Sequence, residues 1–226
     1  MGKKGIIRHK IALYLRKKGE KMELQQAIEK RHTVRRFTAQ EISPEILREL
    51  VRRAGMAPSI NNTQSWKFIV VTNKPLIAEL SACVHKRIHQ LFSDTGKENL
   101  LKTVDHFSTV FEQAPAVIFV ATQPYKAIAD DLHSVTISHE ALNEMRRHPD
   151  LQSVGAAVQN LLLSAVDLNL GSCWLSGLMV ARIELEKLLH IEKPWELVTA
   201  VAIGQPAGEA KAKERKPVEE ILELIA

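Results

Sequence analysis

The sequence is short of cysteine and of aromatic side chains, and it has no long apolar run. Only Cys83 and Cys173 occur in 226 residues, so we expect no disulfide framework and a reducing compartment. No stretch approaches the ~20 consecutive apolar residues of a membrane-spanning helix. The apolar residues 11–15 form too short a run for a secretory signal, and a basic stretch follows them directly. These absences predict a cytoplasmic protein with no membrane partner.

The common motifs for nucleotides and nucleic acids are also missing. No G-x-G-x-x-G follows a predicted strand and no G-x-x-x-x-G-K-S/T occurs, which argues against a dinucleotide-binding Rossmann site and a P-loop. The net charge of +5 would attract any anion. Aromatic residues make up only 5% of the chain, and neither an aromatic run nor a cysteine finger typical of nucleic-acid readers is present. A basic nucleic-acid-binding protein is therefore a remote alternative, and no nucleic-acid partner is expected.

What is present is an ordinary globular composition, with 45% hydrophobic and 25% charged residues. Short β-branched and apolar runs predict strands at residues 66–72, 116–121, 171–175 and 197–203. Apolar residues at helical spacing predict helices at residues 22–30, 44–54, 75–92, 151–168 and 184–190. Strands separated by helices indicate an α+β or α/β sandwich.

Local residues indicate where some of these elements begin and end. Ser43 followed by Pro44 predicts a helix start, and Gly55 predicts its end. The apolar helix at residues 151–168 is expected inside the molecule or in a subunit interface, with Gly171 ending it. Residues 93–115 are charged and have poor hydrophobic periodicity, so no helix or strand is predicted there.

The chain is expected to form one domain with an extension. Residues 1–21 are basic and weakly patterned, so we treat them as an N-terminal extension. The domain itself is assigned to residues 22–226.

Positive charges and a hydroxyl gather at residues 31–36. Arg31, Thr33 and Arg35 could clamp one phosphate group, because guanidinium forks match phosphate oxygens and the hydroxyl adds a donor. The plain alternative is a solvated surface, where most arginines lie. A second basic group near the C-terminus includes Lys213 and Arg215, and its plain alternative is a solvated tail.

Two further stretches have the chemistry to bind a planar polar ligand. Residues 58–66 contain Ser59, Asn62 and Gln64, which can both donate and accept hydrogen bonds. A simple Asn-rich turn is the alternative. Residues 171–177 begin and end with glycine, which would let backbone N–H groups approach a flat ligand or would merely shape a strand and a turn.

The histidines have ordinary explanations. His85 and His89 lie four residues apart, but no H-E-x-x-H motif accompanies them. His133, His139 and Glu140 match no common zinc spacing, and we assign them to a solvated or lid segment. No metal site is predicted.

Cysteine and phenylalanine are also assigned to packing. Cys173 has no basic neighbour in sequence and is expected in the core. Phe107 and Phe111 are expected in the core too, with stacking on a substrate as the alternative. We nominate no catalytic acid or base.

In their order and spacing, four segments together resemble the nitroreductase family of FMN-dependent oxidoreductases. The segments are residues 31–37, 57–66, 170–174 and 203–217. The resemblance covers about residues 22–217. It implies an α+β fold, an α-β-α sandwich with a mainly antiparallel central sheet. It further implies a homodimer with FMN bound at the subunit interface, in which the apolar residues 221–225 dock on the partner subunit.

The resemblance also implies which residues hold FMN. They are Arg31, His32, Thr33, Arg35, Pro58, Ser59, Ile60, Asn62, Gln64, Leu175, Ser176, Gly177, Lys213 and Arg215. Residues 31–35 and 213–215 would hold the phosphate, the ribityl chain and the pyrimidine carbonyl. Residues 58–64 would meet the ribityl chain and the polar edge of the ring, with only the backbone serving at Ile60. Residues 175–177 would lie beside the central ring, where a backbone amide can reach the flavin N5.

The implied reaction is electron transfer from NADH or NADPH to a nitroaromatic, quinone or similar acceptor. The flavin carries the chemistry and the protein positions it, so a ping-pong cycle is expected. The alternative is a relative that uses the same FMN site for flavin breakdown, dehalogenation or azoline oxidation, because such a relative would share every residue above.

Overall fold

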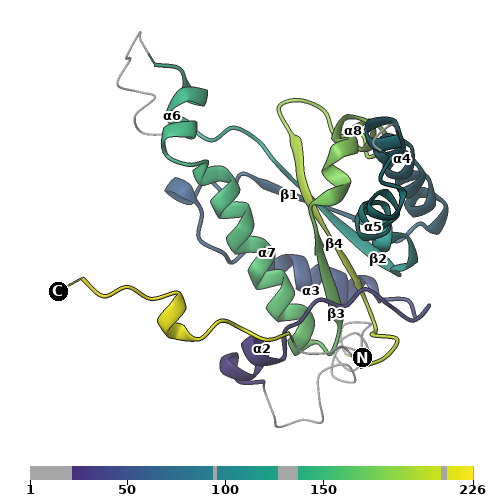
Figure 1. The fold of residues 1–226 in the computed structure, drawn as a ribbon. Helices are drawn as coiled ribbons and strands as arrows, with labels where there is room; N and C mark the ends of the chain where they lie inside the picture. The colour runs from purple at the N-terminus through teal and green to yellow at the C-terminus, as the bar shows by residue number, and fades with distance from the viewer. Residues whose placement is uncertain (1–21, 94–95, 127–136, 210–212, 226) are drawn as a thin grey trace, which may run out of the picture.

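A computed structural model describes residues 22–93, 96–126, 137–209 and 213–225 of the chain. A four-stranded sheet lies between two layers of helices (Figure 1). Each face of the sheet has its own cluster of buried apolar side chains. The predicted α-β-α sandwich is thus confirmed for a single chain.

The sheet is antiparallel throughout. Its strands are β1 (Trp66–Val71), β2 (Ala116–Thr122), β3 (Gly171–Leu175) and β4 (Glu196–Gly204), in the order β1-β2-β4-β3. Neighbouring strands pair antiparallel at all three junctions. The central strands β2 and β4 are almost entirely buried, because helices cover both of their faces. All four predicted strands are confirmed to within one residue.

One face of the sheet is covered by α3 (Pro44–Ala54) and α7 (Pro149–Asp167). The start of α3 is the predicted one, because the Ser43 hydroxyl accepts a hydrogen bond from the Ile46 N–H, and Gly55 caps its end. α7 packs against both α3 and the sheet, so its predicted interior position is confirmed. The buried residues of α7 include Val154, Val158, Leu161 and Ala165.

The other face carries α4 (Lys74–Phe92), α5 (Glu98–Thr109), η3 (Val110–Gln113), η5 (Gly177–Ala181) and α8 (Arg182–Leu188). Phe111 packs edge to face on Phe119 with ring centroids 6.3 Å apart. His85 Nδ1 lies 2.5 Å from Asp105 Oδ1, so this histidine joins α4 to α5.

Two predictions about elements are wrong. Residues 98–109 form α5, although no element was expected there. The exposed side of α5 carries Leu100, Val104 and Phe107, which blurs the contrast between a polar and an apolar face. α7 ends at Asp167, and the left-handed residue after it is Asn169 with φ 57°, not Gly171. Gly171 instead opens β3.

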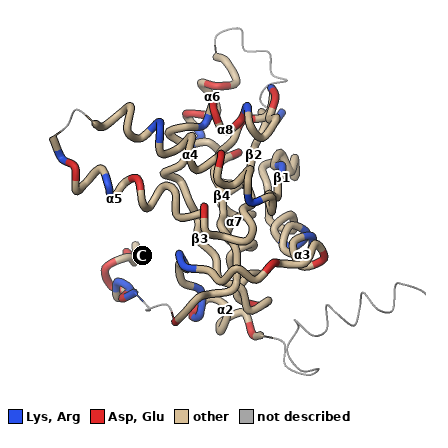
Figure 2. The backbone as a smooth tube through the Cα atoms, turned by 90° about the vertical axis from the view of Figure 1, so that its right-hand side faces the viewer, with Lys and Arg blue, Asp and Glu red and all other residues tan. Residues whose placement is uncertain are grey.

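The smaller elements lie at the margins of the sandwich. They are α2 (Leu24–Lys30), η1 (Ile60–Asn62), α6 (His139–Met145) and η6 (Val218–Glu220). Residues 213–225 project away from the body and are called the arm below (Figures 1 and 2). Within the described ranges, no helix combines the length and the apolar character needed to cross a bilayer. The proposed extension at residues 1–21 and the candidate His133 lie outside the described residues.

An ion-pair network joins α3 to α7. Glu49 accepts hydrogen bonds from Arg52 Nε at 2.7 Å and from Arg53 Nε at 2.8 Å. Arg53 also donates to Asp167 of α7 at 2.5 Å. The hydrogen bonds from Arg52, and less strongly those from Arg53, lower the pKa of Glu49 to about 2 against the opposing effect of partial burial.

The network predicts a specific acid sensitivity. Because the pKa of Glu49 is lower in the folded chain than its ordinary 4.5, its stabilisation is complete above pH 4.5 and is lost as the pH falls toward 2. Glu49→Gln should lower the melting temperature at neutral pH and flatten its decrease between pH 5 and pH 3, measured by thermal unfolding. Glu98→Gln, an exposed control on α5, should keep the wild-type slope. An unchanged slope in Glu49→Gln would contradict this account.

Candidate functional site

Backbone pairing holds the arginine-rich segment at an edge of the sheet. Thr33 forms a parallel bridge with Ser172 of β3, and the Val34 N–H donates to the Ser172 carbonyl at 2.9 Å. Further along the segment, Phe37 forms an antiparallel bridge with Pro206. The segment is therefore fixed between β3 and the residues that follow β4.

A close approach at Gly171 sets the distance between this segment and β3. A Cβ built on Gly171 would lie 2.8 Å from the Val34 Cβ, which is closer than real Cβ contacts allow. Only glycine permits this spacing. Val34 is buried by it, whereas Arg31, Thr33 and Arg35 remain half-buried and accessible.

The accessible side chains of the segment carry unneutralised positive charge. Arg31 and Arg35 form no ion pair with a carboxylate in the described part of the chain, whereas Arg53 and Arg182 are both paired. The His32 ring is held by a 2.7 Å hydrogen bond between Nδ1 and the Lys30 carbonyl. Such unpaired guanidiniums on a fixed backbone suit an anionic ligand.

The second basic group follows β4. Residues 206–207 pair antiparallel with residues 36–37, so the chain leaves the sheet in the direction of Arg31. Lys213 and Arg215 are exposed at the start of the arm. Figure 2 shows basic residues both around α2 and on the nearby arm. The course of the chain is thus compatible with the predicted convergence of the two basic groups, and no contact between them is described.

A groove of about 500 Å³ opens between the end of β3 and α7. Trp174 and Ser176 line one side, and Leu151, Val154 and Gly155 of α7 line the other. Ser176, one of the three residues predicted to lie beside the flavin ring, therefore borders a mostly apolar groove at the end of the strand whose start pairs with the arginine segment.

Trp174 forms a fixed wall of this groove. Its Nε1–H donates to the buried Thr199 Oγ1 at 2.8 Å, and Thr199 in turn donates to the Leu175 carbonyl at 2.7 Å. The indole is still 46% exposed, so its polar edge is satisfied while the rest of the ring can contact a ligand. This role could not be predicted from the sequence, because the hydrogen bond depends on the pairing of β3 with β4.

The 58–64 loop has an unusual backbone. Asn61, Asn62 and Gln64 all adopt left-handed conformations with φ between 47° and 54°. The Ser59 hydroxyl accepts from the Gln64 N–H at 2.9 Å, and Gln64 Nε2 donates to Asn62 Oδ1 at 3.3 Å. Pro58, Asn62 and Gln64 are exposed. The loop therefore presents polar groups on a backbone that its own hydrogen bonds fix.

The backbone of Ile60 is engaged within the chain. Its N–H donates to Ser153 Oγ at 3.1 Å, and its carbonyl accepts from the Thr63 N–H at 2.9 Å. These bonds attach the loop to the first part of α7 and occupy the backbone groups that were expected to serve a cofactor.

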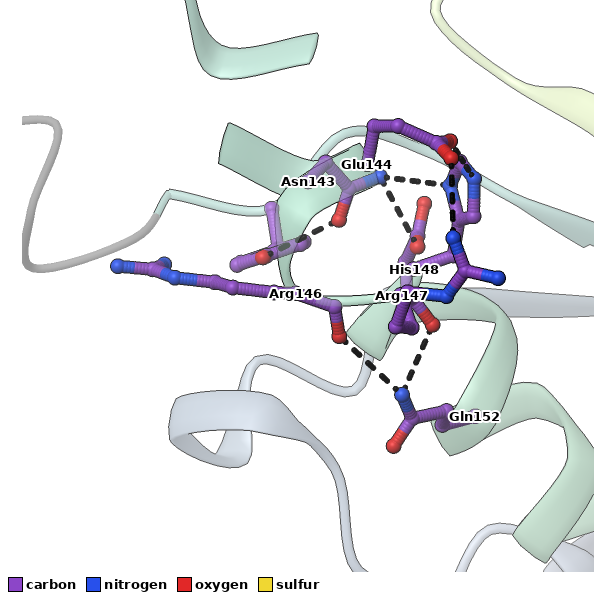
Figure 3. A network of polar contacts seen from close by, with 8 residues as sticks. Asn143, Glu144, Arg146, Arg147, His148 and Gln152 are labelled. Atoms are coloured by element: carbon purple, nitrogen blue, oxygen red, sulfur yellow. Dashed lines mark hydrogen bonds and ion pairs between the residues drawn. The ribbon is translucent and has the colours of Figure 1, made fainter. Parts of the chain in front are cut away.

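The start of α7 is itself fixed by a polar network (Figure 3). Arg147 and His148 are left-handed, with φ of 59° and 55°. Gln152 Nε2 donates to the Arg147 carbonyl at 2.8 Å, and His148 Nε2 lies 2.6 Å from Glu144 Oε2. This junction orients α6 and the α7 end that carries the 58–64 loop.

One chain unites only part of the predicted site. Residues 31–35 lie at the start of β3, next to the C-terminal end of α7, whereas Trp174 and Ser176 at the end of β3 face the first part of α7. The 58–64 loop is bound to Ser153, near the other end of that helix. In Figure 1 the loop and α2 accordingly lie toward opposite ends of α7.

Of the remaining candidate residues, Cys173 and Phe111 lie in the core, whereas Phe107 does not. Burial raises the pKa of the Cys173 thiol against the attraction of Arg35, and this cysteine packs in the core as predicted. Phe111 is fully buried, also as predicted. Phe107 is 49% exposed, so its predicted core position is wrong. Its ring centroid lies 5.1 Å from Arg35 Cζ.

The chain is similar to known proteins over most of its length. The solved structure of a BluB-like flavoprotein from Clostridium difficile 630 has a TM-score of 0.82 and 32% identity, covering 91% of this chain and 100% of that one. Iodotyrosine deiodinase of Nematostella vectensis is 26% identical over 92% of this chain and 76% of its own length. The oxygen-insensitive NADPH nitroreductase of Helicobacter pylori strain J99 is 26% identical, covering 84% of this chain and 91% of its own length.

The family pattern described as the nitroreductase family matches residues 28–205. The match includes the arginine segment, the 58–64 loop, the groove and all four strands. The chain therefore belongs to the nitroreductase family.

Proposed function

We propose that this chain binds FMN and passes electrons from NADH or NADPH to a nitroaromatic, quinone or similar acceptor. The observation that carries the proposal is the β3 edge: Arg31 and Arg35, without carboxylate partners in the described chain, lie on a fixed backbone at the start of the strand, and a groove walled by Trp174 opens at its end. When bound, FMN would supply a ring that accepts a hydride and releases electrons to a second substrate.

The residues present fit such a group. A phosphate needs positive donors with no competing carboxylate, and Arg31 and Arg35 have none among the described residues. A flat ring needs an apolar wall, which Trp174 and Val154 provide. One cluster of guanidiniums and the lack of a dinucleotide fingerprint favour a mononucleotide over a dinucleotide.

Each part of the edge has a separate task in this proposal. Arg31 and Thr33 bind the phosphate and the ribityl chain, and Lys213 and Arg215 add positive charge from the arm. Arg35 faces the pyrimidine end of the ring and stabilises the negative charge that the ring gains on reduction. Such attraction is worth about 4 kcal/mol for charges about 4 Å apart at an effective dielectric of about 20. No catalytic acid or base is required.

We also propose a homodimer with FMN at the subunit interface. The 58–64 loop lies toward the other end of α7 from Arg31, so the loop of one subunit would complete the edge of its partner. Leu24 and Ile28 of α2 are 67% and 53% exposed, which supports a covering subunit. Ile221, Leu222, Leu224 and Ile225 of the arm are exposed as well.

A specialised reaction at the same site is the second candidate. The similarity to a deiodinase and to a BluB-like flavoprotein favours chemistry on an aromatic ring, such as dehalogenation or breakdown of a flavin. The Trp174 wall would serve either reaction, so the acceptor has to be identified by experiment.

The first prediction concerns turnover. Purified protein loaded with FMN should lose its yellow colour when mixed with NADH or NADPH in a stopped-flow instrument. The colour should return on adding a nitroaromatic or a quinone, with parallel lines in double-reciprocal plots. Failure of both nicotinamides to bleach bound FMN would exclude the proposed donor. Release of halide from a halogenated tyrosine, without nitroaromatic turnover, would select the second candidate.

The second prediction concerns the phosphate clamp. Arg31→Ala and Arg215→Ala should each weaken FMN binding roughly 10- to 100-fold, because each removes a charge-assisted hydrogen bond of about 1.5–3 kcal/mol. Arg52→Ala is the matched control, since this arginine is 62% exposed on α3. Isothermal titration of the apoprotein with FMN measures the effect. Wild-type affinity in both clamp variants would refute the clamp.

The third prediction concerns the shared site. Arg31→Ala and the double variant Asn62→Ala/Gln64→Ala should each bind FMN weakly. In a mixed dimer of the two variants, one site combines an intact arginine segment with an intact loop. After unfolding and joint refolding, about a quarter of all sites should therefore recover wild-type affinity. Each variant refolded alone is the control. No recovery in the mixture would place the loop and the segment in the same subunit's site.

A further inference from the structure

Two consecutive residues of α5 contact two different parts of the proposed FMN site. The Phe107 ring centroid lies 5.1 Å from Arg35 Cζ. The next residue, Ser108, is packed so closely against Gly177 that a Cβ there would lie 2.4 Å from the Ser108 Oγ. One turn of one helix therefore contacts both the arginine segment and the end of β3.

The C-terminal end of α5 is anchored in the core. Ser108 and Thr109 are buried, and the following Phe111 is fully buried against Phe119. Gly177 can have no side chain at this point, because Ser108 fills the space that a Cβ would need. The position of α5 relative to residues 175–177 is thus set by direct contact.

Phe107 does not have the burial expected of a core residue. It is 49% exposed, although the residues that follow it in the sequence are buried. Its face is turned to the guanidinium of Arg35, which has no carboxylate partner in the described ranges. An arginine over an aromatic face is attracted to the electrons of the ring, and more strongly when both groups are desolvated. The ring is therefore the contact that restrains this guanidinium.

We propose that Phe107 is a positioning residue that holds Arg35 toward the pyrimidine end of the flavin ring. Ser108 fixes the same helix against Gly177, so α5 sets the spacing between Arg35 and the backbone at residues 175–177. This inference rests on the proposed FMN site and goes beyond it, because it assigns the control of Arg35 to a helix that makes no predicted contact with the cofactor.

We expect the contact between Phe107 and Arg35 to strengthen the binding of reduced FMN more than the binding of oxidised FMN. Arg35 attracts the charge that the ring gains on reduction, and a restrained guanidinium does so without first losing side-chain freedom. A guanidinium released from the ring would spend part of its time in other rotamers. Loss of the Phe107 ring should therefore lower the affinity for reduced FMN relative to oxidised FMN.

The test compares Phe107→Leu with Phe107→Tyr. Leucine keeps the apolar bulk but removes the ring face, whereas tyrosine keeps that face. In Phe107→Leu the preference for reduced over oxidised FMN should fall about fivefold, which is a decrease of about 20 mV in the two-electron midpoint potential at about 30 mV per tenfold. Phe107→Tyr should keep the wild-type potential. Leu100→Ala is the control on the same helix, where the side chain is 60% exposed.

A second measurement uses the protein without flavin. With ¹⁵N-labelled arginine, the Nε–H signal of Arg35, assigned from Arg35→Lys, should show an upfield ring-current shift. That shift should vanish in Phe107→Leu and persist in Phe107→Tyr. If the protein shows this ring-current shift but does not bind FMN, the contact between Phe107 and Arg35 is supported and the proposed function is refuted.

Three results would overturn the inference. The first is a wild-type apoprotein without the ring-current shift. The second is a flavin potential that is the same in Phe107→Leu as in the wild type while Arg35→Ala lowers it. The third is an equal change of potential in Phe107→Leu and Phe107→Tyr, because only Phe107→Leu removes the ring face.

Discussion

The pairing of residues 33–37 with Ser172 on one side and Pro206 on the other is the constraint on which the site depends. It brings a segment from the start of the domain against strands from its second half. Because Val34 fits only over Gly171, this pairing has a single register. The positions of Arg31, Thr33 and Arg35 follow from that register.

The arginines of residues 31–35 are held by backbone pairing and not by ion pairs with carboxylates. Elsewhere in the described chain, arginines such as Arg53 and Arg182 are neutralised by carboxylates that join helices. Along residues 31–35 the backbone pairing holds the positive charges in place without such partners. These charges therefore remain available to bind an anion. The aromatic face of Phe107 restrains Arg35 without neutralising it, which leaves the charge available.

The sequence predicted most of the fold because the strands are buried apolar runs between turn residues, and helix starts such as Ser43-Pro44 have clear signals. It missed α5, whose apolar side is partly exposed at Leu100 and Val104. The FMN-binding residues were predicted by resemblance to a family, since short arginine and asparagine clusters have many uses. The roles of Trp174 and Phe107 could not be predicted, because each depends on a partner from a distant element: Thr199 for the indole and Arg35 for the phenyl ring.

The arm also has a consequence for how the protein exists in the cell. Ile221, Leu222, Leu224 and Ile225 extend from the body with their apolar surface uncovered. A lone chain must leave that surface in water, at a cost of roughly 25 cal/mol for each Å². In the proposed homodimer, mass action would tie the fraction of chains with a covered arm to the concentration of the chain itself. At low expression, chains without a partner would keep this apolar surface open to aggregation and to proteases, so the gene dosage as well as the fold would determine how much dimer accumulates.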